Sequence, residues 1–257
     1  MEKKVDQASC AGGHLKHLVK ISAFGGLFFS FSGTMFIWAG SDSFNFPSTI
    51  WRSCGFFNIA MFVLTWLAYI PFRNTDKVLG NGVLALFIIF SWFWMFGFAG
   101  FYFYFLFVPN ALWMRGSIVF AVTLALIFHG RLILRDINEA FANHVGLLEE
   151  MFRDEGASLT FTREAITLLE KRRKDRNPFK SIHMYFALGI TPFVLIFNRL
   201  MSPIVGDGHG VFLIIAFFAV PIMQWQVEVF VQTFVVMIYY PIKLYRTTGK
   251  LVLLKDW

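Results

Sequence analysis

Three polar side chains recur at four-residue spacing inside a long apolar run near the end of the chain. They are Gln224, Glu228 and Gln232, and they share one face of a helix that turns once every 3.6 residues or so. An ionised carboxylate in lipid costs about 3 kcal/mol or more, so Glu228 is expected to face the protein interior or water. A carboxylate in that setting can relay a proton or cation, or balance the charge of a ligand.

The same stripe also has a structural interpretation, which we favour. Glutamine side chains and a protonated or paired glutamate can join neighbouring helices or subunits by hydrogen bonds. Asn198 and Arg199 lie at a similar expected depth in the preceding apolar run. We therefore expect one of them to contact the Gln224–Gln232 face, the alternative being that Arg199 extends toward the outer headgroups.

A second pattern consists of small residues every four positions in the first apolar run. Small side chains at this spacing let two helix backbones approach closely. The pattern predicts a packing seam, within one chain or between chains, formed by Ser22, Gly26, Ser30 and Thr34.

A third pattern is a concentration of basic residues between the fourth and fifth apolar runs. Anionic lipid attracts such residues by about 1 kcal/mol each near the membrane surface. The predicted contacts with lipid headgroups are Arg131, Arg135, Lys171, Arg172, Arg173 and Lys174. The simpler interpretation is that these residues only set the orientation of the chain in the membrane.

The sequence lacks the common catalytic, phosphate-binding and metal-binding motifs, including HExxH, GxSxG and the P-loop. Cys10 and Cys54 are expected on opposite sides of the membrane. His129 and His183 are expected near one face, where an isolated histidine is usually a boundary residue. We therefore predict no metal, no cofactor and no enzymatic activity.

Composition indicates the elements that must position these residues. Of the 257 residues 57% are apolar and only 15% are charged, against about 45–50% and 25% in soluble domains. A soluble fold of this size cannot bury 34 phenylalanines, whereas lipid can surround them. The net charge of +7 comes from short segments between apolar runs, so we do not expect a nucleic-acid partner.

A membrane-spanning helix needs about 20 mostly apolar residues. Six runs meet this requirement or approach it: Ile21–Gly40, Gly55–Phe72, Leu79–Val108, Ser117–Gly130, Ile182–Met201 and Val211–Tyr240. The first run is too long for the core of a signal peptide, so it is expected to remain as a span.

The orientation follows from the lysine and arginine residues. With six spans and both termini in the cytoplasm, all 23 except Arg52, Arg115 and Arg199 fall on the cytoplasmic side. Short loops and few cysteines favour a bacterial inner membrane.

The segment 131–181 is predicted to form a cytoplasmic helical hairpin. Its first helix carries an apolar stripe, namely Leu134, Ile137, Phe141, Val145, Leu148 and Phe152. Its second helix is expected to begin near Thr160 or Thr162, to bury Ile166 and Leu169, and to end at Asn177–Pro178. Too small for a core of its own, the hairpin must pack on other helix ends or another chain.

These patterns together predict an all-α, polytopic integral membrane protein with three regions. The regions are a four-span part at 1–130, the hairpin at 131–181 and a two-span part at 182–257. Membrane lipids are the expected partners, with a homo-oligomer or a larger membrane complex as the expected assembly. The predicted function is that of a non-enzymatic subunit assembling through its spans and hairpin, and the alternative is a transporter or ion-conducting protein using Glu228.

Overall fold

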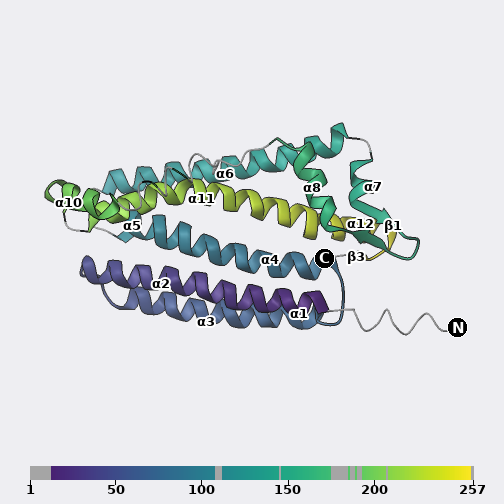
Figure 1. Cartoon of the computed structure of the whole chain (residues 1–257), viewed down its shortest axis with the longest axis horizontal. Coiled ribbons are helices and arrows are strands. Elements are labelled where there is room, and N and C mark those ends of the chain that lie inside the picture. Colours follow the sequence, from purple (N-terminus) through teal and green to yellow (C-terminus); the bar gives the residue numbers. More distant parts are fainter. Residues whose placement is uncertain are drawn as a thin grey trace.

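A computed structural model describes residues 13–107, 112–144, 146–174, 193–206 and 208–255, together with residues 185 and 189. Long helices lie side by side in an elongated bundle with a small sheet at one end (Figure 1). Five helices are long and apolar enough to cross a membrane: Leu15–Ser43, Thr49–Phe72, Val78–Phe107, Leu112–Asn143 and His209–Thr248. The chain is therefore a mainly α-helical, membrane-embedded protein.

Five of the six predicted apolar runs coincide with these five helices, except that Val108 at the end of the third run lies outside the described residues. The other four helices extend past their runs, because helical hydrogen bonding does not end where the hydrocarbon does. The largest extension is in the fourth, where Ser117–Gly130 is the middle of one helix that ends at Asn143. Nine of the 20 residues of the remaining predicted span, Ile182–Met201, lie outside the described residues, and its end belongs to a shorter helix, α10 (Val194–Val205).

The first three spans are each made of joined helical segments. The first contains α1 (Gly13–Lys20), a π-helical turn η2 (Ile21–Gly25) and α2 (Gly26–Ser43). The second contains α3 (Thr49–Tyr69) and a 3₁₀ turn η3 (Ile70–Phe72). The third contains α4 (Val78–Phe93), the π-helical segment η4 (Trp94–Tyr102) and α5 (Phe103–Phe107).

The rest of the chain alternates long helices with short elements. In order, these are α6 (Leu112–Asn143), α7 (Leu147–Met151), β1 (Phe152–Asp154), β2 (Leu159–Phe161), α8 (Arg163–Arg172), α10 (Val194–Val205), α11 (His209–Phe234), the π-helical turn η6 (Val235–Tyr239), α12 (Tyr240–Thr248) and β3 (Val252–Leu254).

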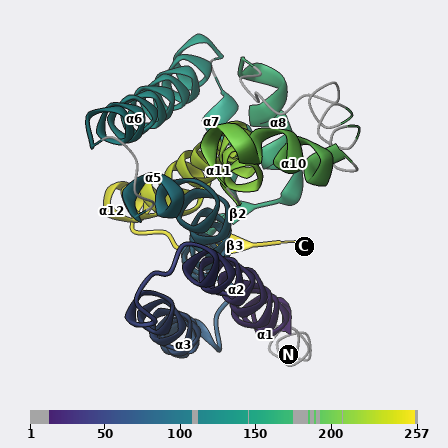
Figure 2. The same cartoon turned by 90° about the vertical axis from the view of Figure 1, so that its left-hand side faces the viewer.

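Viewed from the end, α3 and α6 occupy opposite edges of the bundle, with α4 and α11 between them (Figure 2). Glycines bring the two central helices together. A Cβ added to Gly82 would lie 2.8 Å from the Cβ of Met237, and one added to Gly97 would lie 3.2 Å from the sulfur of Met223. Any larger residue at Gly82 would therefore push the last span away from the third.

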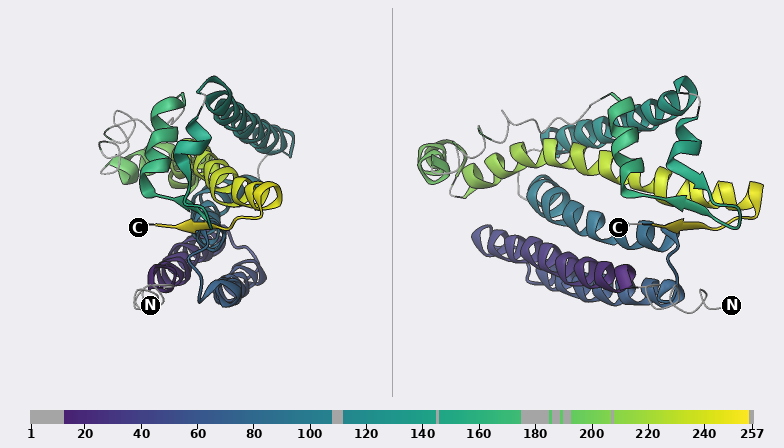
Figure 3. Two further views of the ribbon diagram at one scale, coloured as in Figure 1. Left: turned by 90° about the vertical axis from the view of Figure 1, so that its right-hand side faces the viewer. Right: turned by 45° about the vertical axis from the view of Figure 1, so that its right-hand side comes forward.

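The three strands form a sheet at one end of the bundle (Figure 3). β1 pairs antiparallel with β2, placing Phe152 opposite Phe161. β2 pairs parallel with β3, placing Leu159 opposite Val252, and a further bridge joins Lys77 to Leu253. We call the end of the bundle that carries the sheet the basic end. It contains α1, the turn at 73–77, residues 146–174 and residues 249–255.

The strands correct the prediction of a purely helical hairpin. Gly156 has a positive φ of 84° in the turn between β1 and β2, a conformation that glycine adopts without strain. β2 gains its second partner from residues 252–254, close to the other end of the sequence. Local periodicity carries no information about a partner that distant, so the sheet was not predicted. We call residues 146–174 with 252–254 the basic-end module.

The apolar faces of the basic-end module are buried against the spans. Ile137, Phe152 and Leu169 are fully buried in one cluster with Val236 of η6, and Phe141 and Leu148 pack against it. Leu134 is exposed and Ile133 is buried in its place, while Val145 lies outside the described residues. α8 begins directly after Thr162, as predicted, and ends at Arg172; Asn177–Pro178 is not among the described residues.

Candidate functional site

Glu228 pairs with Arg173, which follows the last residue of α8. Arg173 Nη2 donates to Glu228 Oε1 in a salt bridge, and both side chains are only 6% exposed. Arg173 has extended backbone angles, φ −94° and ψ 154°, which end the helix at this residue. The salt bridge therefore links the basic-end module to the middle of the last long apolar helix, His209–Thr248.

This contact corrects one predicted headgroup residue. Arg173 is buried in the protein, whereas Arg131, Lys171, Arg172 and Lys174 are exposed. Arg135 is also exposed, with its Nε 3.4 Å from Glu139 Oε1. Four consecutive basic residues give no periodic signal that singles out the third, so the sequence did not separate Arg173 from its neighbours. Headgroup contact by the exposed residues stays a prediction.

Asn198 and Arg199 lie elsewhere than predicted. The backbone N–H of Val211 donates to Asn198 Oδ1 at 3.3 Å, which places α10 beside the first turn of α11. Arg199 is exposed. Glu228 is 17 residues beyond Val211, or about 25 Å along the helix axis. The prediction counted the depth of Asn198 and Arg199 along one straight helix from His183, whereas α10 begins at Val194 and lies beside the start of α11.

The polar stripe on α11 is only partly buried, and a fourth polar residue lies off it. Gln224 and Gln232 are half-buried, whereas Gln226 is 1% exposed. Within the described part of the chain, neither Nε2 nor Oε1 of Gln226 has a hydrogen-bond partner. Asp136 on α6 is a second buried polar residue that the sequence analysis missed. The available signal was a further polar residue, Gln226, two positions from both Gln224 and Glu228 in an apolar run.

The predicted small-residue seam packs inside the chain. Ser22, Gly26, Ser30 and Thr34 are all buried. A Cβ added to Gly26 would lie 3.0 Å from Ser91 Oγ on α4. Thr34 Oγ1 accepts a hydrogen bond of 2.8 Å from Asn58 Nδ2 on α3. The seam therefore joins the first span to the second and third.

A groove of about 420 Å³ opens between α2 and α3 on the outer surface of the bundle. Thr34 and Asn58 are buried residues that line it, and Asn58 Oδ1 has no partner among the described residues. Gly55 also lines the groove, and a Cβ added there would meet nothing within 4 Å. The other walls are apolar and aromatic: Leu27, Phe31, Met35, Trp38, Trp51 and Ile59.

Among the described residues, the histidines and cysteines do not cluster at one site. No group of three His, Cys, Asp or Glu residues able to hold a metal ion occurs in the part of the chain that was described. His209 Nδ1 lies 2.9 Å from the hydroxyl of Tyr104, and Cys54 is buried. Cys10 and His183 lie outside the described residues.

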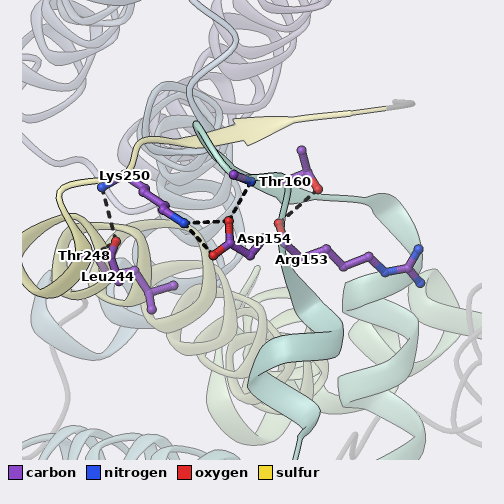
Figure 4. Close-up of polar contacts among 7 residues, drawn as sticks. Arg153, Asp154, Thr160, Leu244, Thr248 and Lys250 are labelled. Atoms are coloured by element: carbon purple, nitrogen blue, oxygen red, sulfur yellow. Dashed lines mark hydrogen bonds and ion pairs between the residues drawn. The ribbon is translucent and has the colours of Figure 1, made fainter.

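Two exposed ion pairs join the sheet to the end of the chain. Lys250 Nζ lies 2.7 and 2.5 Å from the two carboxylate oxygens of Asp154, and Lys255 Nζ lies 2.6 Å from Glu155 Oε1 (Figure 4 draws the first pair). The hydrogen bond from each lysine lowers the pKa of its carboxyl partner below the ordinary range. Both pairs are therefore charged at neutral pH.

The chain matches no protein-family model, and no curated protein or solved structure shows significant similarity to it. The functional argument therefore depends on the geometry above.

Proposed function

We propose that this chain is a non-enzymatic integral membrane protein that assembles with a second copy of itself through the α2–α3 groove. The observation that carries the proposal is the groove itself, a hollow of about 420 Å³ on a lipid-facing surface. Lipid tails are as apolar as leucine, so helices associate in a membrane by close packing and not by hydrophobic exclusion. A hollow beside a glycine offers such packing to a helix.

A second copy is the occupant that best fits the shape of this face. Two-fold symmetric contact requires one surface to carry both a hole and the side chains that fill it. Gly55 is the hole, and Phe56 and Ile59 on the same helix are 76% and 62% exposed. α3 also lies at the edge of the bundle, where a neighbouring molecule can approach it (Figure 2).

The proposal includes an orientation. Lys16, Lys20, Arg73 and Lys77 lie at the basic end together with the basic-end module, and a positive end is retained in the cytoplasm. Both termini are then cytoplasmic, which is consistent with a bacterial inner membrane protein.

The salt bridge of Glu228 supports a structural role for this residue. A proton or cation relay needs a carboxylate that exchanges with water or with the transported ion. Glu228 is instead held by Arg173, with both side chains almost completely buried. We therefore assign the pair to the attachment of the basic-end module and do not carry the transport alternative further.

Replacing Gly55 tests the proposal. Gly55→Leu fills the groove, and the control Gly116→Leu introduces the same side chain at an α6 glycine that is equally open. Light scattering across a dilution series in mild detergent should give a dimer for the wild type and for Gly116→Leu. Gly55→Leu should weaken dimerisation about tenfold or more. A wild-type monomer at every concentration, or dimers of equal affinity for all three proteins, contradicts the proposal.

A further inference from the structure

A second pocket, of about 340 Å³, opens at the basic end between three separate segments. The end of the second span and the turn after it contribute Phe72 and Lys77. α12 contributes Ile242 and Arg246, and β3 contributes Val252. Most of the lining is apolar, while the two cations come from different segments. Neither the groove between α2 and α3 nor the Arg173–Glu228 pair shares a residue with it.

The cations of this pocket are available to a ligand. Lys77 and Arg246 make no ion pair within the described parts of the chain. Asp76 is the neighbouring acidic residue, and its backbone oxygen accepts a hydrogen bond from the N–H of Leu254. Arg73 and Lys243, both exposed on the same segments, keep the local charge positive after Asp76 is counted.

The pocket lies at the level of the lipid headgroups. The second span, Thr49–Phe72, has 24 residues and is about 36 Å long, slightly more than the hydrocarbon thickness of about 30 Å. Its last residue, Phe72, lines the pocket, as does Leu79 near the start of the next span. Exposed Ile242 and Tyr245 surround the opening, and such apolar and tyrosine side chains are typical of the membrane interface.

We propose that this pocket binds one anionic phospholipid. Its phosphate lies between Lys77 and Arg246, whose side chains donate charge-assisted hydrogen bonds to the phosphate oxygens. One acyl chain lies along the apolar wall formed by Phe72, Leu79 and Ile242. A free phosphate would leave that wall unoccupied, and a zwitterionic lipid would bring its own cationic group next to Lys77 and Arg246. The pocket is distinct from the exposed basic residues at 171, 172 and 174.

Native mass spectrometry of protein taken from mixed phosphatidylglycerol and phosphatidylcholine membranes tests the site. The wild type should retain one phosphatidylglycerol molecule. Lys77→Gln with Arg246→Gln should reduce that bound fraction about tenfold. The matched control, Lys171→Gln with Lys174→Gln, removes the same charge from exposed residues of the same end and should retain the lipid. The charge-preserving pair Lys77→Arg with Arg246→Lys should also retain it.

Competition on the wild-type protein gives a test that does not depend on a folded variant. Spin-labelled phosphatidylglycerol should be displaced by unlabelled phosphatidylglycerol and not by phosphatidylcholine or inorganic phosphate. Displacement by inorganic phosphate would identify a free anion as the ligand and overturn the proposal. Equal displacement by phosphatidylcholine would contradict a specific site for an anionic lipid. Equal lipid loss in the glutamine pair and the control pair would also contradict it, because it would show only general attraction to a positively charged surface.

Discussion

Of the ion pairs that join the basic-end module to the last part of the chain, Arg173–Glu228 and Lys250–Asp154 differ most clearly in burial. The side chains of Arg173 and Glu228 are each 6% exposed, whereas those of Lys250 and Asp154 are 30% and 57% exposed. Water screens the second pair, and such surface pairs contribute little to stability. Arg173 and Glu228 contact each other in place of water, so removing either side chain leaves the other charge buried and uncompensated.

The comparison shows which contact determines the position of the module. An exposed pair can break and reform with little change in free energy, so it does not fix a structure. A buried pair has one low-energy arrangement, because either charge alone is strongly disfavoured in an apolar environment. Arg173 and Glu228 therefore define where α8 meets α11, while apolar burial in the surrounding cluster supplies most of the stabilisation.

The largest expected effect comes from removing one buried charge. Glu228→Leu leaves Arg173 buried without its described partner and should lower the free energy of unfolding by about 3–5 kcal/mol. Thermal or denaturant unfolding in detergent measures the change. Adding Arg173→Met to Glu228→Leu should recover most of the loss. A double variant as unstable as the single one would contradict the role given to this pair.

A smaller effect of opposite sign is expected at Gln226. Its buried amide has no partner in the described part of the chain, so Gln226→Leu removes a desolvated polar group at nearly constant volume. We expect the free energy of unfolding to rise by about 1–3 kcal/mol. The same unfolding assay applies, with Gln224→Leu, a half-buried position, as the control that should change less. A lower stability would show that Gln226 has a partner, such as a bound water.

The buried hydrogen bond between the first two spans should give a still smaller loss. Thr34→Val keeps the shape of the side chain and removes the acceptor for Asn58 Nδ2. We expect a loss of about 0.6–1.7 kcal/mol, the range found for hydrogen bonds between membrane helices. Ser32→Ala removes an exposed hydroxyl bonded only within its own helix and should have almost no effect. Equal losses for the two variants would contradict the importance of burial.

The smallest expected effect belongs to the exposed pair, and it depends on acid pH. Lys250 lowers the pKa of Asp154, so the pair stabilises the fold above the ordinary pKa of an aspartate, about 4. This contribution is lost as the pH falls through the lower pKa of the folded state. The stability difference between wild type and Asp154→Asn should therefore be small at neutral pH and vanish in acid. A difference that grows in acid has the wrong sign for this account.

The membrane character of the chain could be predicted from sequence because it depends on local composition. The length of a run such as Gly55–Phe72 can be counted in the sequence. Five of the predicted runs coincide with long apolar helices. The burial of Glu228 was also predictable, since a carboxylate in an apolar run has few other places to lie. Both inferences need only the residue and its immediate neighbours.

The contacts between distant segments could not be predicted in this way. Pairing of Leu159 with Val252 and of Glu228 with Arg173 depends on how the basic-end module folds back on the spans. The prediction paired Glu228 with Asn198 or Arg199 because it assumed that the fifth run is one straight helix. α10 instead lies beside the start of α11, far along the helix from Glu228.

The measurement that tests this account most directly is labelling of single cysteines from either side of sealed, right-side-out vesicles. Lys16→Cys and Glu149→Cys place exposed thiols at the basic end, and Asp42→Cys places one at the opposite end, each in a chain with Cys10 and Cys54 changed to serine. A membrane-impermeant reagent should label Asp42→Cys in intact vesicles and the other two only after permeabilisation. Labelling of Glu149→Cys and Asp42→Cys from the same side would contradict the arrangement of the bundle across the membrane.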